Sequence, residues 1–188
     1  MKQFFLLTLA LTITLFAGCG NDDDDVNPIV FIGTIDGWMI EAVTSNYQAQ
    51  ADAAIASVTE EDLAAAGLTR AEVTSIFNTR IADATQVEPC DQDDGLFFSP
   101  EGATQLLRRF EFCPDGDLNV LDVFHARAYS LTGDASQITF RALNGSNADV
   151  YNIDELSVAK FRFGKTRTVS DTLVGTFMYD IEYDLTAF

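Results

Sequence analysis

Residues 177–185 read Phe-Met-Tyr-Asp-Ile-Glu-Tyr-Asp-Leu, and large apolar side chains occupy the odd-numbered positions of this stretch. Carboxylates occupy three of the even positions, Asp180, Glu182 and Asp184. Because successive side chains of a β-strand point to opposite faces, this alternation predicts a strand with one apolar and one wet face. We expect it to be the last strand of the fold, over residues 173–185, with its apolar face lining a core.

Seven shorter runs upstream have strand character, and turn sequences rich in Pro, Gly and Asn separate many of them. They cover residues 38–43, 96–98, 104–112, 119–131, 137–143, 149–153 and 156–163. In the run 156–163, Ala159, Phe161 and Phe163 share the expected inner face. The short turns favour antiparallel pairing, and closure of the sheet abolishes exposed edges. The sequence therefore predicts a mainly β fold, an eight-stranded antiparallel up-and-down barrel, with a two-sheet sandwich as the alternative.

Residues 47–85 interrupt the strand pattern with an alanine-rich helical insertion. Two apolar stripes at helical spacing support it: Tyr47, Ala51, Ala54, Ile55, Val58 and then Val73, Ile76, Phe77, Ile81, Ala84. Between them, Thr59 with Asp62 caps a short helix that Gly67 ends, and Thr69 with Glu72 forms a capping box. We expect two or three amphipathic helices, which serve either as a lid over a cavity mouth or as a structural plug.

Near the N-terminus, Lys2 supplies a positive charge, and an uncharged apolar run follows over residues 4–17. This run is too short to span a bilayer and is typical of a secretory signal peptide. The sequence Ala17-Gly18-Cys19 resembles the lipobox of bacterial lipoproteins, in which the cysteine is lipidated after the signal is removed. The resemblance implies a signal peptide at 1–18, a lipidated Cys19 with an acidic tether at 19–29, and a barrel domain at 30–188. An ordinary signal peptide beside a free cysteine is the alternative.

The aspartate run at 22–25 follows Cys19 closely. It resembles lipoproteins of the Bacteroidota, in which acidic residues after the lipidated cysteine accompany export to the outer face of the outer membrane. The resemblance implies a protein held in the outer membrane by N-terminal acyl chains and facing the cell exterior. The alternative is a solvated spacer without sorting meaning.

Two cysteines, Cys90 and Cys113, remain once Cys19 is assigned to lipid. An even number of cysteines in an oxidising compartment favours a disulfide between them. Two reduced, buried cysteines are the alternative. A zinc site is disfavoured, because His125 is the sole histidine and the ligand count stays too low.

Several segments in order resemble the lipocalin-like domains of Bacteroidota surface lipoproteins: Gly37-Trp38, residues 90–94 leading into 96–98, the turn 99–102, Tyr129-Ser130-Leu131 and Tyr151-Asn152-Ile153. The resemblance implies a barrel that binds a small molecule. Classical lipocalins carry a basic residue on the last strand that stacks on the tryptophan of the first. Residues 173–185 contain none, and Arg167, expected in the preceding loop, is the candidate substitute.

The candidate ligand-binding residues are aromatic side chains with same-face spacing on the expected strands, together with one arginine. They are Arg108, Phe110, Phe112, Phe124, Phe140, Phe161, Phe163, Phe177, Tyr179 and Tyr183. An eight-stranded barrel is just wide enough to be filled by side chains or to hold one small ligand. Arg108 is either an anchor for an anionic lipophile or a barrel-end residue that reaches water.

Composition and motifs narrow the function classes. The net charge of −18 opposes binding to nucleic acid. No nucleophile elbow, P-loop, dinucleotide fingerprint or HExxH helix occurs, so we predict no enzyme, catalytic residue or cofactor. Asp91, Asp93 and Asp94 leave an irregular calcium loop open, although a turn accounts for them and we assign no metal. We predict a lipoprotein that binds a small hydrophobic ligand. The alternative is a structural or protein-interaction lipoprotein with a filled barrel and an unidentified partner.

Overall fold

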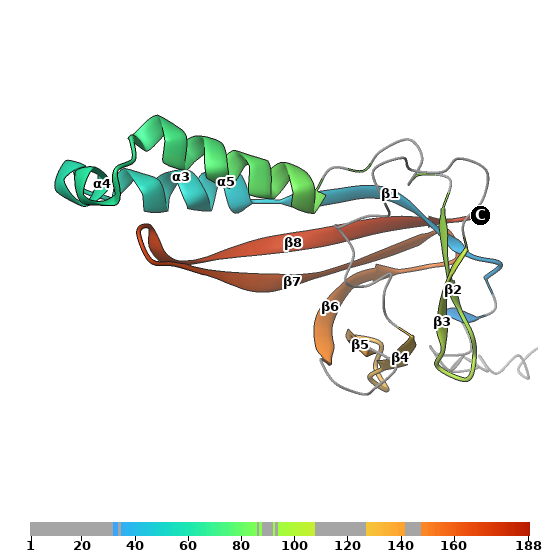
Figure 1. Cartoon of the computed structure of the whole chain (residues 1–188). Helices are drawn as coiled ribbons and strands as arrows, with labels where there is room; N and C mark the ends of the chain where they lie inside the picture. Colours follow the sequence, from blue (N-terminus) through green and yellow to red (C-terminus); the bar gives the residue numbers. More distant parts are fainter. Residues whose placement is uncertain are drawn as a thin grey trace, which may run out of the picture.

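The computed structural model describes residues 32–33, 35–85, 87, 92, 94–107, 127–141 and 148–188, which include eight strands in one antiparallel sheet (Figure 1). The strands are β1 (Trp38–Ser45), β2 (Gly95–Phe98), β3 (Thr104–Leu107), β4 (Ala128–Leu131), β5 (Gln137–Arg141), β6 (Asp149–Leu156), β7 (Lys160–Asp171) and β8 (Gly175–Ala187). Their spatial order is β3-β2-β1-β8-β7-β6-β5-β4, so strands that are consecutive in sequence pair with one another, except that β3 and β4 lie at the two ends of the sheet, and β1 pairs with β8. This order confirms the predicted up-and-down barrel.

The barrel is nearly closed by contacts between the ends of the sheet, at β3 and β4. A bridge joins Ala103 to Ala128, and the Tyr129 amide donates to the Gly102 carbonyl at 2.7 Å. The Tyr129 hydroxyl also donates to the Ser99 carbonyl at 2.8 Å. Burial, with a contribution from the Glu101 carboxylate, raises the pKa of Tyr129 to about 12, so this donor keeps its proton. The seam therefore depends on a side-chain bond as well as on a short ladder.

The longest ladder pairs β7 with β8 without interruption, from Lys160 opposite Thr186 to Asp171 opposite Gly175. Its inward face carries two rows of side chains: Phe161, Phe163, Lys165, Arg167, Val169 on β7 and Phe177, Tyr179, Ile181, Tyr183, Leu185 on β8. On the outward face, Arg162 pairs with Asp184 at 3.1 Å and with Glu182 at 3.4 Å. The predicted separation of apolar and carboxylate faces on the last strand is confirmed.

The expected strand at 156–163 was wrong in its bounds. Leu156 ends β6, and a tight turn follows in which the Ser157 amide donates to the Lys160 carbonyl at 2.8 Å. Ala159 is exposed in this turn, whereas Phe161 and Phe163 are buried as expected. Beyond Phe163, β7 continues to Asp171, so Arg167 lies in a strand and not in a loop. The side chains at 165 and 167 are charged, and the apolar alternation that marks a strand stops before them.

Three helices lie between β1 and β2 in the described part of the chain, as predicted: α3 (Tyr47–Ala56), α4 (Glu60–Ala66) and α5 (Arg70–Thr85). The Thr59 hydroxyl accepts from the Asp62 amide at 3.1 Å, and Gly67 ends α4 at φ 69°. The Thr69 amide donates to the Glu72 carboxylate at 2.8 Å, which confirms the capping box. Ile76 departs from the expected apolar stripe, because it is 43% exposed.

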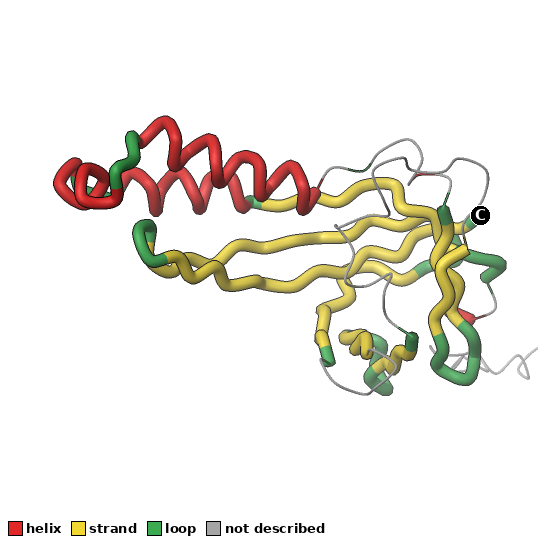
Figure 2. Tube along the Cα trace, viewed as in Figure 1, coloured by secondary structure: helices red, strands yellow, loops and turns green. Residues whose placement is uncertain are grey.

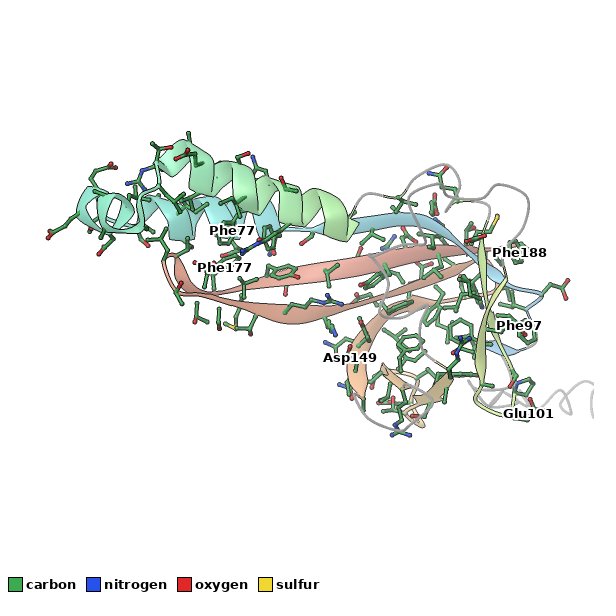
Figure 3. The ribbon with its side chains drawn as sticks, in the orientation of Figure 1. Phe77, Phe97, Glu101, Asp149, Phe177 and Phe188 are labelled. Atoms are coloured by element: carbon green, nitrogen blue, oxygen red, sulfur yellow. The ribbon has the colours of Figure 1, made fainter. Side chains whose placement is uncertain are left out.

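The helices pack against the β7–β8 hairpin where it extends past the barrel (Figures 1 and 2). The Tyr47 ring centroid lies 5.5 Å from that of Phe177 and 4.9 Å from that of Tyr179. Phe77 of α5 lies 6.0 Å from Phe177, and Figure 3 shows both rings between the helices and the hairpin. We call α3–α5 with the distal hairpin, residues 168–178, the arm. One face of β8 thus supplies both the barrel core and the arm core.

Replacing Phe177 with Ala should lower the free energy of unfolding by about 3–5 kcal/mol, because a buried ring is lost from the arm core. Hydrogen exchange should show lost protection in α3 and α5 with protection of β1 and β6 retained. Met178→Ala is the matched control, because Met178 is 63% exposed on the opposite face. Equal effects of the two substitutions would contradict this packing.

Ala135 adopts a left-handed backbone conformation, φ 54°, in the turn between β4 and β5. A side chain costs energy in this region, so Ala135→Gly should raise the free energy of unfolding by about 0.5–1 kcal/mol in urea denaturation. Ala159→Gly is the control, because Ala159 also lies in a turn but its own φ is not positive. This substitution should lower the free energy of unfolding, because glycine loses more conformational entropy on folding. A loss of stability in Ala135→Gly would contradict the assigned conformation.

Candidate functional site

Aromatic rings fill the barrel interior at the end where Trp38 lies, which we call the closed end. Trp38 is fully buried, and its ring centroid lies 5.5 Å from that of Phe161. Phe161 lies 4.7 Å from Phe163 and 5.8 Å from Phe98. The contacts continue from Phe163 to Phe140 and Tyr151, both at 5.5 Å, and to Tyr183 at 5.3 Å. This half of the interior is a packed core.

The ring of Phe188, the last residue of the sequence, lies against Gly37 and Gly95 at the ends of β1 and β2 (Figure 3). The Phe188 amide donates to the Gly37 carbonyl at 3.1 Å. A Cβ atom at Gly37 would come within 2.0 Å of the Phe188 ring, and one at Gly95 within 2.3 Å. Both positions therefore need glycine, because the aromatic ring occupies the space where a side chain would begin.

Gly95→Ala should lower the free energy of unfolding by about 1–3 kcal/mol, because the Phe188 ring must leave its place. Gly133→Ala is the control, since nothing lies within 4 Å of a Cβ atom there. The double variant Gly95→Ala with Phe188→Ala should lose less than the sum of the single variants in thermal denaturation. Additive losses would mean that the ring does not sit on Gly95.

The interior changes character beyond Phe163, where β7 places two cations on its inward face. The Lys165 ammonium lies 2.7 Å from the Asp149 carboxylate and 4.5 Å from the centroid of the Tyr151 ring. The Lys165 side chain is 15% exposed, whereas Asp149, at the start of β6, is 43% exposed (Figure 3). Lys165 is therefore enclosed, and its carboxylate partner lies at the rim.

Arg167 lies two residues farther along β7, among three tyrosines. Burial lowers the pKa of Arg167, but the nearby hydroxyls of Tyr183, Tyr151 and Tyr179 more than offset it, and the pKa is raised. The guanidinium therefore stays charged. We call this cluster the cationic mouth; its members are Asp149, Tyr151, Lys165, Arg167, Tyr179 and Tyr183.

The cationic mouth presents hydrogen-bond donors toward the barrel interior. Burying a cation costs several kcal/mol unless partners compensate, and aromatic faces and a carboxylate supply part of that compensation. The Tyr151 hydroxyl is fully buried beside the Arg167 guanidinium. Two cations and a buried phenol can bind the polar end of a ligand.

The expected ligand-binding residues fall into three groups. Phe140, Phe161, Phe163 and Tyr183 belong to the packed cluster at or next to the closed end. Phe177 and Tyr179 contact Tyr47 of the arm. The third group lies outside the described residues and consists of Arg108, Phe110, Phe112 and Phe124. Cys19, Cys90, Cys113, His125, Asp91 and Asp93 also lie outside the described residues.

Lys165 and Arg167 were missed as site residues by the sequence-based reasoning. Lys165 and Arg167 follow Phe161 and Phe163 at intervals of two residues, which places all four side chains on the same face of a strand. This spacing is the sequence feature from which they could have been predicted. Arg167 does not stack on Trp38, because Trp38 packs on Phe161 while Arg167 lies among the tyrosines farther along β7. The expected substitution for the lipocalin-type basic residue was therefore wrong.

Other features of the described residues are less informative about function. No three His, Cys, Asp or Glu side chains among them are grouped to hold a metal ion. Their helices include none that is long and apolar enough to cross a membrane. A shallow groove of about 380 Å³ runs along α5 and is lined by Leu68, Glu72, Ser75, Ile76 and Thr79. It lies on the arm, away from the cationic mouth.

No protein-family model matches the chain, and no curated protein matches it.

Proposed function

We propose that this chain is a membrane-anchored, lipocalin-like lipoprotein whose barrel binds a small hydrophobic ligand. The observation that carries the proposal is the pair of cations on the inward face of β7. A barrel that serves only as a filled scaffold would be more stable with apolar residues at these positions, because buried charges are costly. An eight-stranded barrel has room for one small ligand, and a few polar groups in an apolar interior are typical of such sites.

Native mass spectrometry of the mature protein purified from its host tests ligand binding. We expect a bound small molecule whose mass is lost when the protein is denatured. If the protein carries no adduct and takes up no added amphiphile, ligand binding is wrong. The alternative then gains support: a structural or protein-interaction lipoprotein with a filled barrel. The packed rings of the closed end favour that alternative.

The membrane anchor is a separate part of the proposal, and the sequence at Cys19 supports it. Cys19→Ala should move the protein from the membrane fraction to the soluble fraction, because acyl chains supply the membrane affinity. Changing residues 22–25 to Asn should keep the protein in membranes but remove its accessibility to external protease. A membrane-bound Cys19→Ala variant would contradict lipidation at this residue.

A further inference from the structure

We infer that the outer edge of β7 in the arm is an interaction surface, which pairs with the same edge of a second copy of this chain. Among the described residues, β6 pairs with β7 only as far as Gly164, whereas β7 continues beside β8 to Asp171. Figure 1 shows this part of the hairpin extending past the barrel. An edge strand presents backbone donors and acceptors that a further strand can satisfy. Pairing at this edge is independent of ligand binding inside the barrel.

The opposite edge of the hairpin, along β8, is closed where β1 ends at Ser45. The side chain of Asn46 takes the place of a strand there, because its carbonyl oxygen accepts from the Asp180 amide at 2.7 Å. The Asn46 backbone amide donates to the Asp180 carbonyl at 3.3 Å, and α3 begins at the next residue. The described chain thus protects the β8 edge with a side chain, which leaves the β7 edge as the place where a strand can be added.

The same hydrogen bonds indicate which backbone groups of β7 point outward. Both backbone groups of Asp180 turn to Asn46, so Asp180 and Thr166 form a non-hydrogen-bonded pair of the β7–β8 ladder. Such pairs alternate with hydrogen-bonded pairs along an antiparallel ladder. The backbone groups of Thr166, Thr168 and Ser170 therefore point away from β8, and all three residues are exposed.

The residues of this edge match themselves when the segment is read in the opposite direction. Residues 166–170 are Thr-Arg-Thr-Val-Ser. Antiparallel pairing about a two-fold axis at Thr168 sets Thr168 opposite Thr168 of the second copy and Thr166 opposite Ser170. Each of these pairs can exchange two backbone hydrogen bonds, and cross-strand pairs of hydroxyl side chains stabilise a sheet. Two-fold symmetry is also the commonest symmetry of protein oligomers.

The distribution of charge favours contact between copies at this edge. The chain carries a net charge of −18, so two copies repel each other over most of their surfaces. Residues 166–170 contain no carboxylate. The carboxylate that follows them, Asp171, lies 3.5 Å from the Arg80 guanidinium of α5. Because the edge is short, we expect a weak and reversible dimer.

Cysteine cross-linking of the mature protein tests the register of this pairing. Directly opposed residues of a hydrogen-bonded pair have Cα atoms about 5.5 Å apart, within the range of a disulfide. Thr168→Cys should therefore form a covalent dimer under oxidised glutathione, seen as a doubled mass on a non-reducing gel. Thr166→Cys is the matched control, because the two copies of residue 166 would lie about 14 Å apart, too far for a disulfide. Combining Thr166→Cys with Ser170→Cys should restore the cross-link.

The wild-type chain under the same conditions sets the background from Cys90 and Cys113. Equal cross-linking of Thr168→Cys and Thr166→Cys would mean that the copies meet by random collision, and would overturn the inference. The absence of a cross-link in Thr168→Cys would overturn it as well, because the two-fold axis would then not lie at this residue.

Thr168→Pro tests the same edge without an added cysteine. Proline removes an outward amide that β8 does not use, so the variant should keep its melting temperature within a few degrees of the wild type while its dimer content falls in sedimentation velocity. Val169→Pro is the contrast, because Val169 lies opposite Phe177 in a hydrogen-bonded pair and its loss should unfold the arm. A wild-type chain that stays monomeric up to about 1 mM, or a Thr168→Pro variant that dimerises as well as the wild type, would overturn the inference.

Discussion

The pairing of β7 with β8 is the constraint on which the rest of the structure depends. Its register sets Phe161 opposite Leu185 and Val169 opposite Phe177, so a single face runs the length of the hairpin. A shift of one residue would turn that face to solvent and bring the outward ion pairs of Arg162 into the core. One register is therefore favoured, because it buries the aromatic rings and any shift would bury the charges of the outward face.

This continuous face explains why the helical insertion exists. The barrel strands flank the hairpin only as far as Gly164 on β7 and Ile181 on β8 in the described residues. Beyond them, the apolar side chains of β8 need a cover, and α3 and α5 provide it through Tyr47 and Phe77. The helices thus have a structural role as the cover of the distal hairpin. Lys165 and Arg167 lie at the junction, where the barrel core ends and the arm core begins.

The sequence predicted the parts of the fold that depend on local pattern. Alternation at 177–185, the capping residues Thr59 and Thr69, and the glycine after α4 all have direct physical signals, and the structure contains each of them. The site was harder to predict. A strand is recognised in a sequence by alternating apolar residues, and the charged residues at 165 and 167 break that alternation. β7 nevertheless continues to Asp171, because it pairs with β8 along its whole length. Phe188 at the closed end carries no local signal, because its contacts with Gly37 and Gly95 depend on barrel closure.

A crystal structure of the mature protein purified from its host is the most direct test of the central claim, that the barrel interior beside β7 binds a small molecule. The expected result is a bound small molecule inside the barrel, in contact with side chains of the inward face of β7. A structure in which side chains alone fill the barrel interior would contradict it.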